Sequence, residues 1–160
     1  RRKTQMTRAE LIREKYKMEK HVEGGAFSVV YTAPYKLNGR PSAGSIFFLL
    51  EGQEFSCMHE LDCDEVWYYH EGCGLKITVL TAEGKNEILL GSDILNGEQH
   101  MAIIPKGCVF AANNLDKDGY TLVSAMTTPG FEYSGFKMLH QQEMAQRFPS
   151  AMNEIGHLIK

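Results

Sequence analysis

The sequence predicts a mostly β domain that folds as a sandwich or a barrel. About eight or nine short strand-like runs follow one another at intervals of roughly ten residues, and glycine, proline or polar turn signals separate them. A chain of 160 residues is long enough to form one domain around one hydrophobic core. Only the two ends of the chain depart from the strand pattern, and both predict helix.

The helical signals at the two ends differ in kind. Thr7 and Glu10 have the spacing of a capping box and precede apolar residues, which predicts a helix from about residue 8 to about residue 18. From residue 141 to 160, apolar side chains recur at helical spacing, and Pro149 divides the segment into two pieces. We expect this segment to cap an open end of the fold or to pack against a partner. The β structure is then expected over about residues 20–139 of a single domain, 1–160.

One of the expected strands is apolar on both faces. Residues 45–50 read Ser-Ile-Phe-Phe-Leu-Leu, which predicts either a central strand or a strand whose second face is covered by another subunit. In an all-β protein the second option points to a dimer. Residues 34–44 are expected to form a loop. The remaining strands are expected at residues 26–32, 75–80, 87–90, 99–104, 108–112 and 120–126.

Charge and composition exclude several classes of function. The formal net charge is -3, and the Lys and Arg residues are scattered outside the first 20 positions, so we expect no nucleic-acid partner. The basic start is followed by no apolar run, so we expect no signal peptide, no membrane segment and a cytoplasmic protein. The four cysteines contain no C-x-x-C pair and predict free thiols.

Residues 52–72 hold the candidate site. Two strand-like runs flank a polar corner, and their alternation places His59 on one face of the first run and Glu65, Trp67 and Tyr69 on one face of the second. A sharp turn at the corner would bring His59 and Glu65 together inside a pocket with aromatic walls. We therefore predict this pair as the catalytic centre of the pocket.

The same stretch resembles the first sequence motif of the cupin superfamily, whose members are small jelly-roll barrels. His59 fits the first histidine of that motif and Glu65 fits its glutamate, whereas Leu61 replaces the second histidine. The second cupin motif resembles residues 105–114, and Phe110 stands where the last metal-ligand histidine of the superfamily would be. Neither Leu61 nor Phe110 has a lone pair to donate to a metal.

A closer resemblance is to the cupin branch described as domain of unknown function 985, also called cupin 5. Its recurring phrases are similar to five runs of this chain, in the same order, and the resemblance covers residues 9 to about 139. It implies an RmlC-like jelly roll, or double-stranded β-helix, that is usually a homodimer and has a cavity lined by the histidine and the glutamate. The five runs are residues 21–25, 45–50, 64–67, 105–107 and 129–132.

The leading interpretation of the pocket is metal-free acid–base chemistry. A carboxylate desolvated among aromatic rings has a raised pKa, while a protonated histidine beside it lowers that pKa, so the pair titrates as one unit nearer to neutral pH. Such a pair suits proton transfer beside a carbonyl, as in the epimerisation or isomerisation of a small polar, sugar-like or keto-acid metabolite. The residues expected to bind this ligand around His59 and Glu65 are His21, Glu23, Tyr31, Trp67, Tyr69, Gln99 and Phe110.

Three other interpretations stay open. A divalent transition metal bound by His59, Glu65 and either His21 or Gln99 would make the protein a metal-dependent oxygenase or isomerase, although we favour no cofactor. A pocket that binds its ligand without consuming it would make the protein a sensor. In the plain structural interpretation, His59 and Glu65 only satisfy each other's hydrogen bonds inside the barrel.

Overall fold

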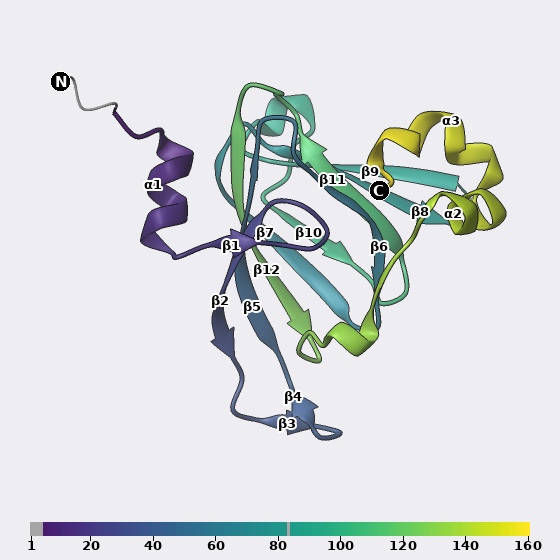
Figure 1. Ribbon diagram of the computed structural model, residues 1–160, viewed down its shortest axis with the longest axis horizontal. Helices are drawn as coiled ribbons and strands as arrows, with labels where there is room; N and C mark the ends of the chain where they lie inside the picture. Colours follow the sequence, from purple (N-terminus) through teal and green to yellow (C-terminus); the bar gives the residue numbers. More distant parts are fainter. Residues whose placement is uncertain (1–4, 83) are drawn as a thin grey trace.

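Two antiparallel sheets form the walls of a jelly-roll barrel in the computed structural model, which describes residues 5–82 and 84–160 (Figure 1). The first sheet has six strands, in the spatial order β1 (Glu19–Lys20), β2 (Ala26–Thr32), β5 (Gly44–Glu51), β12 (Tyr120–Thr128), β7 (Asp64–Gly72) and β10 (Met101–Ile104). The second has five strands, in the spatial order β13 (Phe136–Met138), β6 (Phe55–Leu61), β11 (Val109–Asn114), β8 (Leu75–Thr81) and β9 (Gly84–Leu90). The prediction of a mostly β fold is confirmed.

Some element bounds differ from those expected from the sequence. The region 34–44 holds a short hairpin of β3 (Lys36–Leu37) and β4 (Arg40–Pro41), which projects at the tip of the β2–β5 ribbon (Figure 1). The strand expected at 99–104 begins only at Met101. The helical elements are α1 (Arg8–Lys15), α2 (Gln141–Arg147), α3 (Met152–Ile155) and the 3-10 turns η1 (Ile94–Asn96), η2 (Tyr133–Gly135), η3 (Pro149–Ala151) and η4 (Gly156–Leu158).

Helix α1 ends three residues earlier than expected because Lys17 adopts a left-handed conformation, with φ 50°. The amide of Met18 then donates to the carbonyl of Arg13 at 3.0 Å, which is the closing hydrogen bond of a Schellman motif. The start of the helix is as predicted, with Thr7 as N-cap and a complete capping box. A local backbone choice that the apolar pattern does not encode therefore sets the end of α1.

Helix α1 also explains why β5 is apolar on both faces. The side chains of Phe48 and Leu50 point into the barrel, whereas Leu49 on the opposite face is buried against Ala9 and Ile12 of α1. The second face is thus covered within the same chain at this end of the strand. The apolar pattern of β5 needs no second subunit there, and the homodimer stays a prediction from the family resemblance.

Removing the cap of α1 is expected to loosen this cover. Thr7 Oγ1 accepts a hydrogen bond from the Glu10 amide at 3.2 Å, and its own amide donates to the Glu10 carboxylate at 2.9 Å. We expect Thr7→Ala to lower the free energy of unfolding by about 1 kcal/mol, as measured by urea denaturation. Thr7→Ser keeps the hydroxyl and should retain most of the stability. An equal loss in both variants would contradict the capping explanation.

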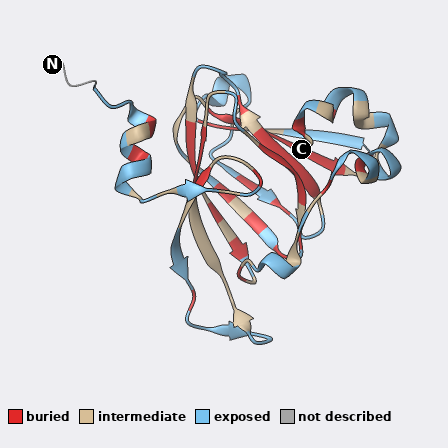
Figure 2. Cartoon of the chain, viewed as in Figure 1, coloured by how far each residue is buried: buried red, intermediate tan, exposed pale blue. Residues whose placement is uncertain are grey.

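The C-terminal segment packs on the outer face of the five-stranded sheet. Met144, Ile155 and Leu158 are buried there against Met58 of β6 and Leu80 of β8, so this part of the sheet has hydrophobic contacts on both faces (Figure 2). The helical spacing predicted this segment as helix, and the structure divides it into α2, η3, α3 and η4 around Pro149. The segment finds its packing partner within the chain.

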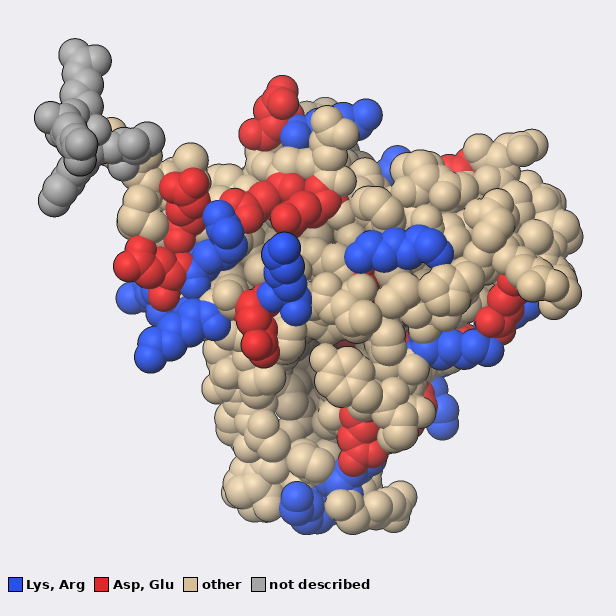
Figure 3. Space-filling model, in the orientation of Figure 1, with Lys and Arg blue, Asp and Glu red and all other residues tan. Residues whose placement is uncertain are grey.

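Charged side chains are mixed over the surface. On the face drawn in Figure 3, Lys and Arg lie among Asp and Glu and form no continuous basic area. Several of them pair across elements, as Arg8 does with Glu71 at 2.8 Å. Within the described residues, none of the helices has both the length and the apolar character needed to cross a bilayer. The four cysteines are free, as expected.

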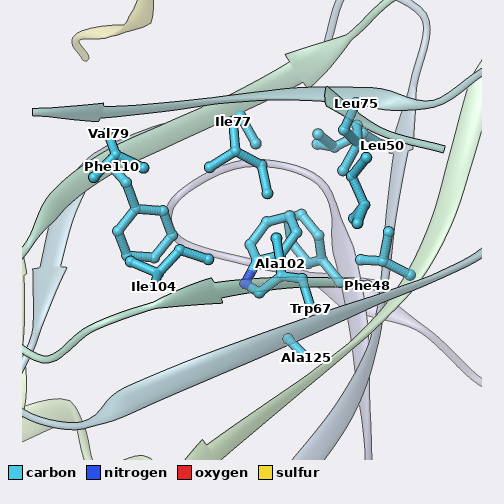
Figure 4. Close-up of a cluster of buried hydrophobic side chains, with 13 residues drawn as sticks. Phe48, Leu50, Trp67, Leu75, Ile77, Val79, Ala102, Ile104, Phe110 and Ala125 are labelled. Carbon is cyan, nitrogen blue, oxygen red and sulfur yellow. The ribbon is translucent and has the colours of Figure 1, made fainter. Parts of the chain in front are cut away.

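The hydrophobic core fills one end of the barrel and leaves the other end hollow. Phe48 and Trp67 from the six-stranded sheet meet Ile77 and Phe110 from the five-stranded sheet (Figure 4). The ring centroids of Trp67 and Phe110 are 6.3 Å apart. Toward one end, Leu50, Leu75 and Leu90 close the interior completely. Toward the other end, the inward positions of β5, β7 and β12 face a cavity instead.

The corner that precedes β7 joins the two sheets. β6 and β7 are consecutive in the chain but belong to different sheets, so the turn at Asp62 and Cys63 carries the chain from one wall of the barrel to the other. The inward-facing residues of β6 and β7 consequently look at each other across the interior. This crossing sets His59 and Glu65 on facing walls of the hollow end.

Candidate functional site

The hollow end of the barrel is a cavity of about 410 Å³, within the size range of small-molecule sites. Its walls are mainly aromatic and aliphatic, and its buried polar groups come from β6, β7, β12 and the loop before β2. The residues around the cavity include Glu19, His21, Glu23, Phe27, Val29, Tyr31, Ile46, Phe48, His59, Leu61, Glu65, Trp67, Ala125, Thr127, Phe131, Tyr133 and Phe136.

The loop at 21–25 reaches the cavity because Gly24 lets it lie directly against β6. Gly24 has φ 116°, and a Cβ at this position would lie 2.0 Å from the carbonyl oxygen of Phe55. The loop is also fastened to β6 by a hydrogen bond, because the Cys57 amide donates to the carbonyl of Glu23 at 2.9 Å. These constraints direct the side chain of Glu23 toward His59.

Glu23 and His59 form a buried ion pair. His59 Nε2 lies 2.9 Å from Glu23 Oε2, and both residues are buried. His59 Nδ1 donates to the carbonyl of Cys57 at 2.6 Å, because a carbonyl oxygen only accepts. Burial by itself lowers the pKa of His59, but the charge and hydrogen bond of Glu23 outweigh it, and the net shift is upward. The imidazole is therefore held as an imidazolium with both N–H groups engaged.

The carboxylate of Glu23 is held ionised mainly by His59. Burial raises the pKa of Glu23, but the charge and hydrogen bond of His59 outweigh it, so the net shift is downward. His21 Nδ1 accepts a hydrogen bond from the Glu23 amide at 3.1 Å, which fixes that nitrogen as unprotonated. Burial lowers the pKa of His21 further, so His21 is the neutral histidine of the site.

Glu65 is the buried carboxyl group of the cavity that forms no ion pair with another described residue. It is 7 % exposed, and its Oε1 accepts a hydrogen bond from the indole N–H of Trp67. Burial, followed by the negative charge of Glu23, raises the pKa of Glu65 to about 7, although His59 and Trp67 act in the opposite direction. Near neutral pH this carboxyl group is present in both protonation states, facing the cavity.

Six of the nine predicted site residues line the cavity. They are His21, Glu23, Tyr31, His59, Glu65 and Trp67. The sequence prediction paired His59 with Glu65, but the residue in direct contact with His59 is Glu23. Strand alternation indicates which face a residue occupies, whereas the approach of the 21–25 loop depends on the fold as a whole.

The other three predicted residues lie outside the cavity wall. Tyr69 shares a face with Trp67 but belongs to the closed end of the barrel, where its hydroxyl donates to the carbonyl of Gly72 at 2.7 Å. Gln99 is exposed, and its main-chain N–H donates a hydrogen bond to the carbonyl oxygen of Leu89. Phe110 packs behind His59, with 4.2 Å between ring centroids, and supports that ring without touching the cavity.

The sequence interpretation missed an aromatic wall at the cavity mouth. Phe131, Tyr133 and Phe136 come from the segment between β12 and the end of β13, and their rings contact one another. The sequence signal available for them was the run at 129–132, which was quoted for the family resemblance and not as part of a pocket. No strand periodicity applies to such a segment.

The side chains of the site do not fit a metal centre of the cupin type. Both ring nitrogens of His59 are already engaged with protein groups, and Leu61 lines the cavity where a second histidine would be required. Among the described residues, no group of three or more His, Cys, Asp or Glu side chains is arranged to hold a metal ion. The Gln99 proposed as a replacement ligand lies away from the cavity.

Comparisons with known proteins agree with the fold. A protein from Shewanella oneidensis is 32% identical, with 97% of this chain and 99% of that chain covered and a TM-score of 0.91. A hypothetical protein from Leishmania major is 26% identical, with 96% and 99% covered and a TM-score of 0.89. Oxalate decarboxylase from Bacillus subtilis shares the fold, at 16% identity and a TM-score of 0.59, with 85% of this chain and 36% of that chain covered.

No curated protein sequence matches the chain. The model of one family does, over residues 9–139, and that family is described as Cupin_5 of the cupin superfamily, DUF985. The match spans the barrel together with all but the first residue of α1, and it includes every residue that lines the cavity. The chain therefore belongs to the Cupin_5 (DUF985) family of the cupin superfamily.

Proposed function

We propose that the cavity binds a small organic molecule and that Glu65 transfers protons to and from it. One observation carries this proposal: a buried carboxyl group with a pKa of about 7 faces a cavity of about 410 Å³. A general acid or base works best when its pKa lies near the working pH. Perturbed carboxyl groups in clefts are also more frequent at functional sites than elsewhere in proteins.

The chemistry that fits this arrangement is proton transfer at a carbon beside a carbonyl. Ionised Glu65 removes a proton from that carbon, and the electron pair moves into the carbonyl as an enolate. The protonated carboxyl then returns the proton to the same carbon or, in an α-hydroxyketone whose hydroxyl proton passes to the enolate oxygen, to the former carbonyl carbon. The net charge of the site does not change in this step, because the negative charge passes from ionised Glu65 to the enolate oxygen and back. The outcome is epimerisation or keto–enol isomerisation, with no oxidant or reductant required.

This proposal is tested by exchange of solvent deuterium into 2-hydroxyacetophenone, an α-hydroxyketone with a ring of suitable size. We expect the wild-type protein to catalyse exchange at the carbon beside the carbonyl near neutral pH, and Glu65→Gln to lose at least about 100-fold of the rate, as followed by NMR. Glu60→Gln is the matched control, because Glu60 pairs with Arg147 outside the cavity. Equal exchange by wild type and Glu65→Gln would contradict the acid–base role.

A second outcome separates catalysis from ligand sensing. A sensor would show a ligand-dependent rise in melting temperature without any exchange into the bound molecule. Binding of 2-hydroxyacetophenone without exchange above the buffer rate would therefore favour the sensor. The proton-transfer step would then be excluded for this class of molecule, although the cavity would still be a binding site.

A further inference from the structure

We propose that the cavity selects a neutral or cationic molecule with a ring-like apolar body and a hydroxyl or amino head group, and that it rejects organic anions. This inference rests on the proposed function of the cavity as a small-molecule site. The sequence suggests a sugar-like or keto-acid ligand. The inference removes the keto acid from that class, because a keto acid carries a negative charge. The charges, the hydrogen-bonding groups and the shape of the lining support it separately.

The charges that line the cavity are unbalanced toward the negative. Three carboxyl groups contribute, from Glu19, Glu23 and Glu65, whereas no Lys or Arg among the described residues lines the cavity. The positive charge of His59 is already matched by Glu23 at 2.9 Å. An anion would therefore enter a buried space with no free cation to receive it, and its desolvation would be uncompensated.

Two cations from segments beside the site, Arg40 and Lys160, have partners outside the cavity. Arg40 binds Asp62 at 3.0 Å and the carbonyl of Gly130, so it fastens the hairpin tip to the segment at the cavity mouth. Lys160 donates to the carbonyl of Val22 at 3.4 Å and does not line the cavity. Neither side chain is placed to meet a carboxylate or phosphate inside the barrel.

Glu65 provides the hydrogen-bonding position for the head group. Its Oε1 accepts a hydrogen bond from the indole N–H of Trp67, and no other described residue donates a hydrogen bond to Oε2. The Glu65 side chain is only 7 % exposed, and buried polar atoms are normally hydrogen-bonded. A ligand that donates a hydrogen bond to Oε2 would therefore be favoured. A hydroxyl or an ammonium group supplies one, and an ammonium group also gains from the negative charge of ionised Glu65.

The walls match an apolar ring. Phe27, Phe48 and Trp67 form the deeper aromatic lining, and Phe131 and Phe136 enclose the opposite side. Aromatic faces bury a ring well, and they attract a cation in preference to an anion because their π faces carry negative charge. Tyr31 and Tyr133 are 51 % and 61 % exposed, so the mouth stays open to solvent at the rim.

The inference is tested with three probes that share one ring and differ in charge: 2-phenylethylamine, 2-phenylethanol and phenylacetate. By calorimetry at pH 7, we expect the amine and the alcohol to bind at least about tenfold more tightly than the carboxylate. Glu65→Gln should remove most of the advantage of the amine over the alcohol, because its side chain carries no charge. Glu60→Gln, outside the cavity, should leave all three affinities unchanged.

The outcomes separate this inference from the proposed function. Phenylacetate binding as tightly as the other two probes would overturn the charge selection and leave the small-molecule site intact. Failure of all three probes to bind would overturn both. Selective binding of the amine and the alcohol, combined with equal deuterium exchange by wild type and Glu65→Gln, would support the ligand class while rejecting the catalytic role.

Discussion

Replacing Glu23 by Gln is expected to cost about 3–5 kcal/mol of the free energy of unfolding at pH 7, because it leaves a buried imidazolium without its counter-charge. Gln keeps the size of the side chain and the main-chain hydrogen bond to Cys57, so the loss reports the charge and not a cavity. Urea denaturation measures the change, and histidine NMR should show the pKa of His59 falling in the variant.

The matched control for this variant is Glu60→Gln on the same strand as His59. Glu60 pairs with Arg147 at 3.3 Å near the surface, where an ion pair contributes only about 0–1 kcal/mol. If Glu23→Gln cost no more than this control, the ion pair of Glu23 and His59 would not be a main support of the hollow end. A pKa of His59 that did not change would lead to the same conclusion.

Strand alternation was sufficient to predict the inward face of the barrel. His59, Glu65 and Trp67 were placed on inner positions by a period of two residues, and all three line the cavity. The same rule placed Tyr69 inward, which is also correct, but alternation does not say how far along the barrel a residue lies. The boundary between packed core and cavity depends on side chains from strands that are distant in the sequence.

The partner of His59 was harder to predict, because it comes from a loop and not from a strand. Glu23 can reach His59 because Gly24 allows the loop backbone to lie against the carbonyl oxygen of Phe55. The sequence interpretation named Glu23 among the ligand-binding residues, and the two glycines that follow it favour a backbone with positive φ. The sequence does not contain the distances that decide whether Glu23 or Glu65 pairs with the imidazolium of His59.

Gln99 illustrates a limit of choosing replacement ligands from the strands that the sequence predicts. The strand expected from residue 99 starts at Met101, so Gln99 stays outside the ladder of β7 and β10 and is exposed. Phe110 does occupy the interior, where it packs on the ring of His59. A phenyl ring at this position supports the orientation of the imidazole through packing, which is a role that a metal-ligand pattern does not describe.

The remaining large effect concerns the pH dependence of stability, which Glu65 is expected to dominate between about pH 4.5 and 7. The pKa of this carboxyl rises from 4.5 in the unfolded chain to about 7 in the fold. In this window the folded protein keeps the proton that the unfolded chain has released, so stability falls as pH rises, by about 1.4 kcal/mol per pH unit. Above about pH 7 Glu65 is ionised in both the folded and the unfolded protein, so this group no longer makes stability depend on pH.

Glu65→Gln removes this dependence because its side chain cannot ionise, and its amide oxygen can still accept the indole N–H of Trp67. We therefore expect the variant to exceed wild type by about 3 kcal/mol at pH 8 and to match it near pH 4.5, as measured by urea denaturation across that range. The pair of Glu23 and His59 is present in both proteins, so the difference between their two curves isolates Glu65. A flat difference would mean that Glu65 is ionised throughout, and it would deprive the proposed proton transfer of its acid. A gain that grows with pH would instead show that the fold buries an ionised carboxylate at a cost in stability, which is expected of a group retained for its chemistry.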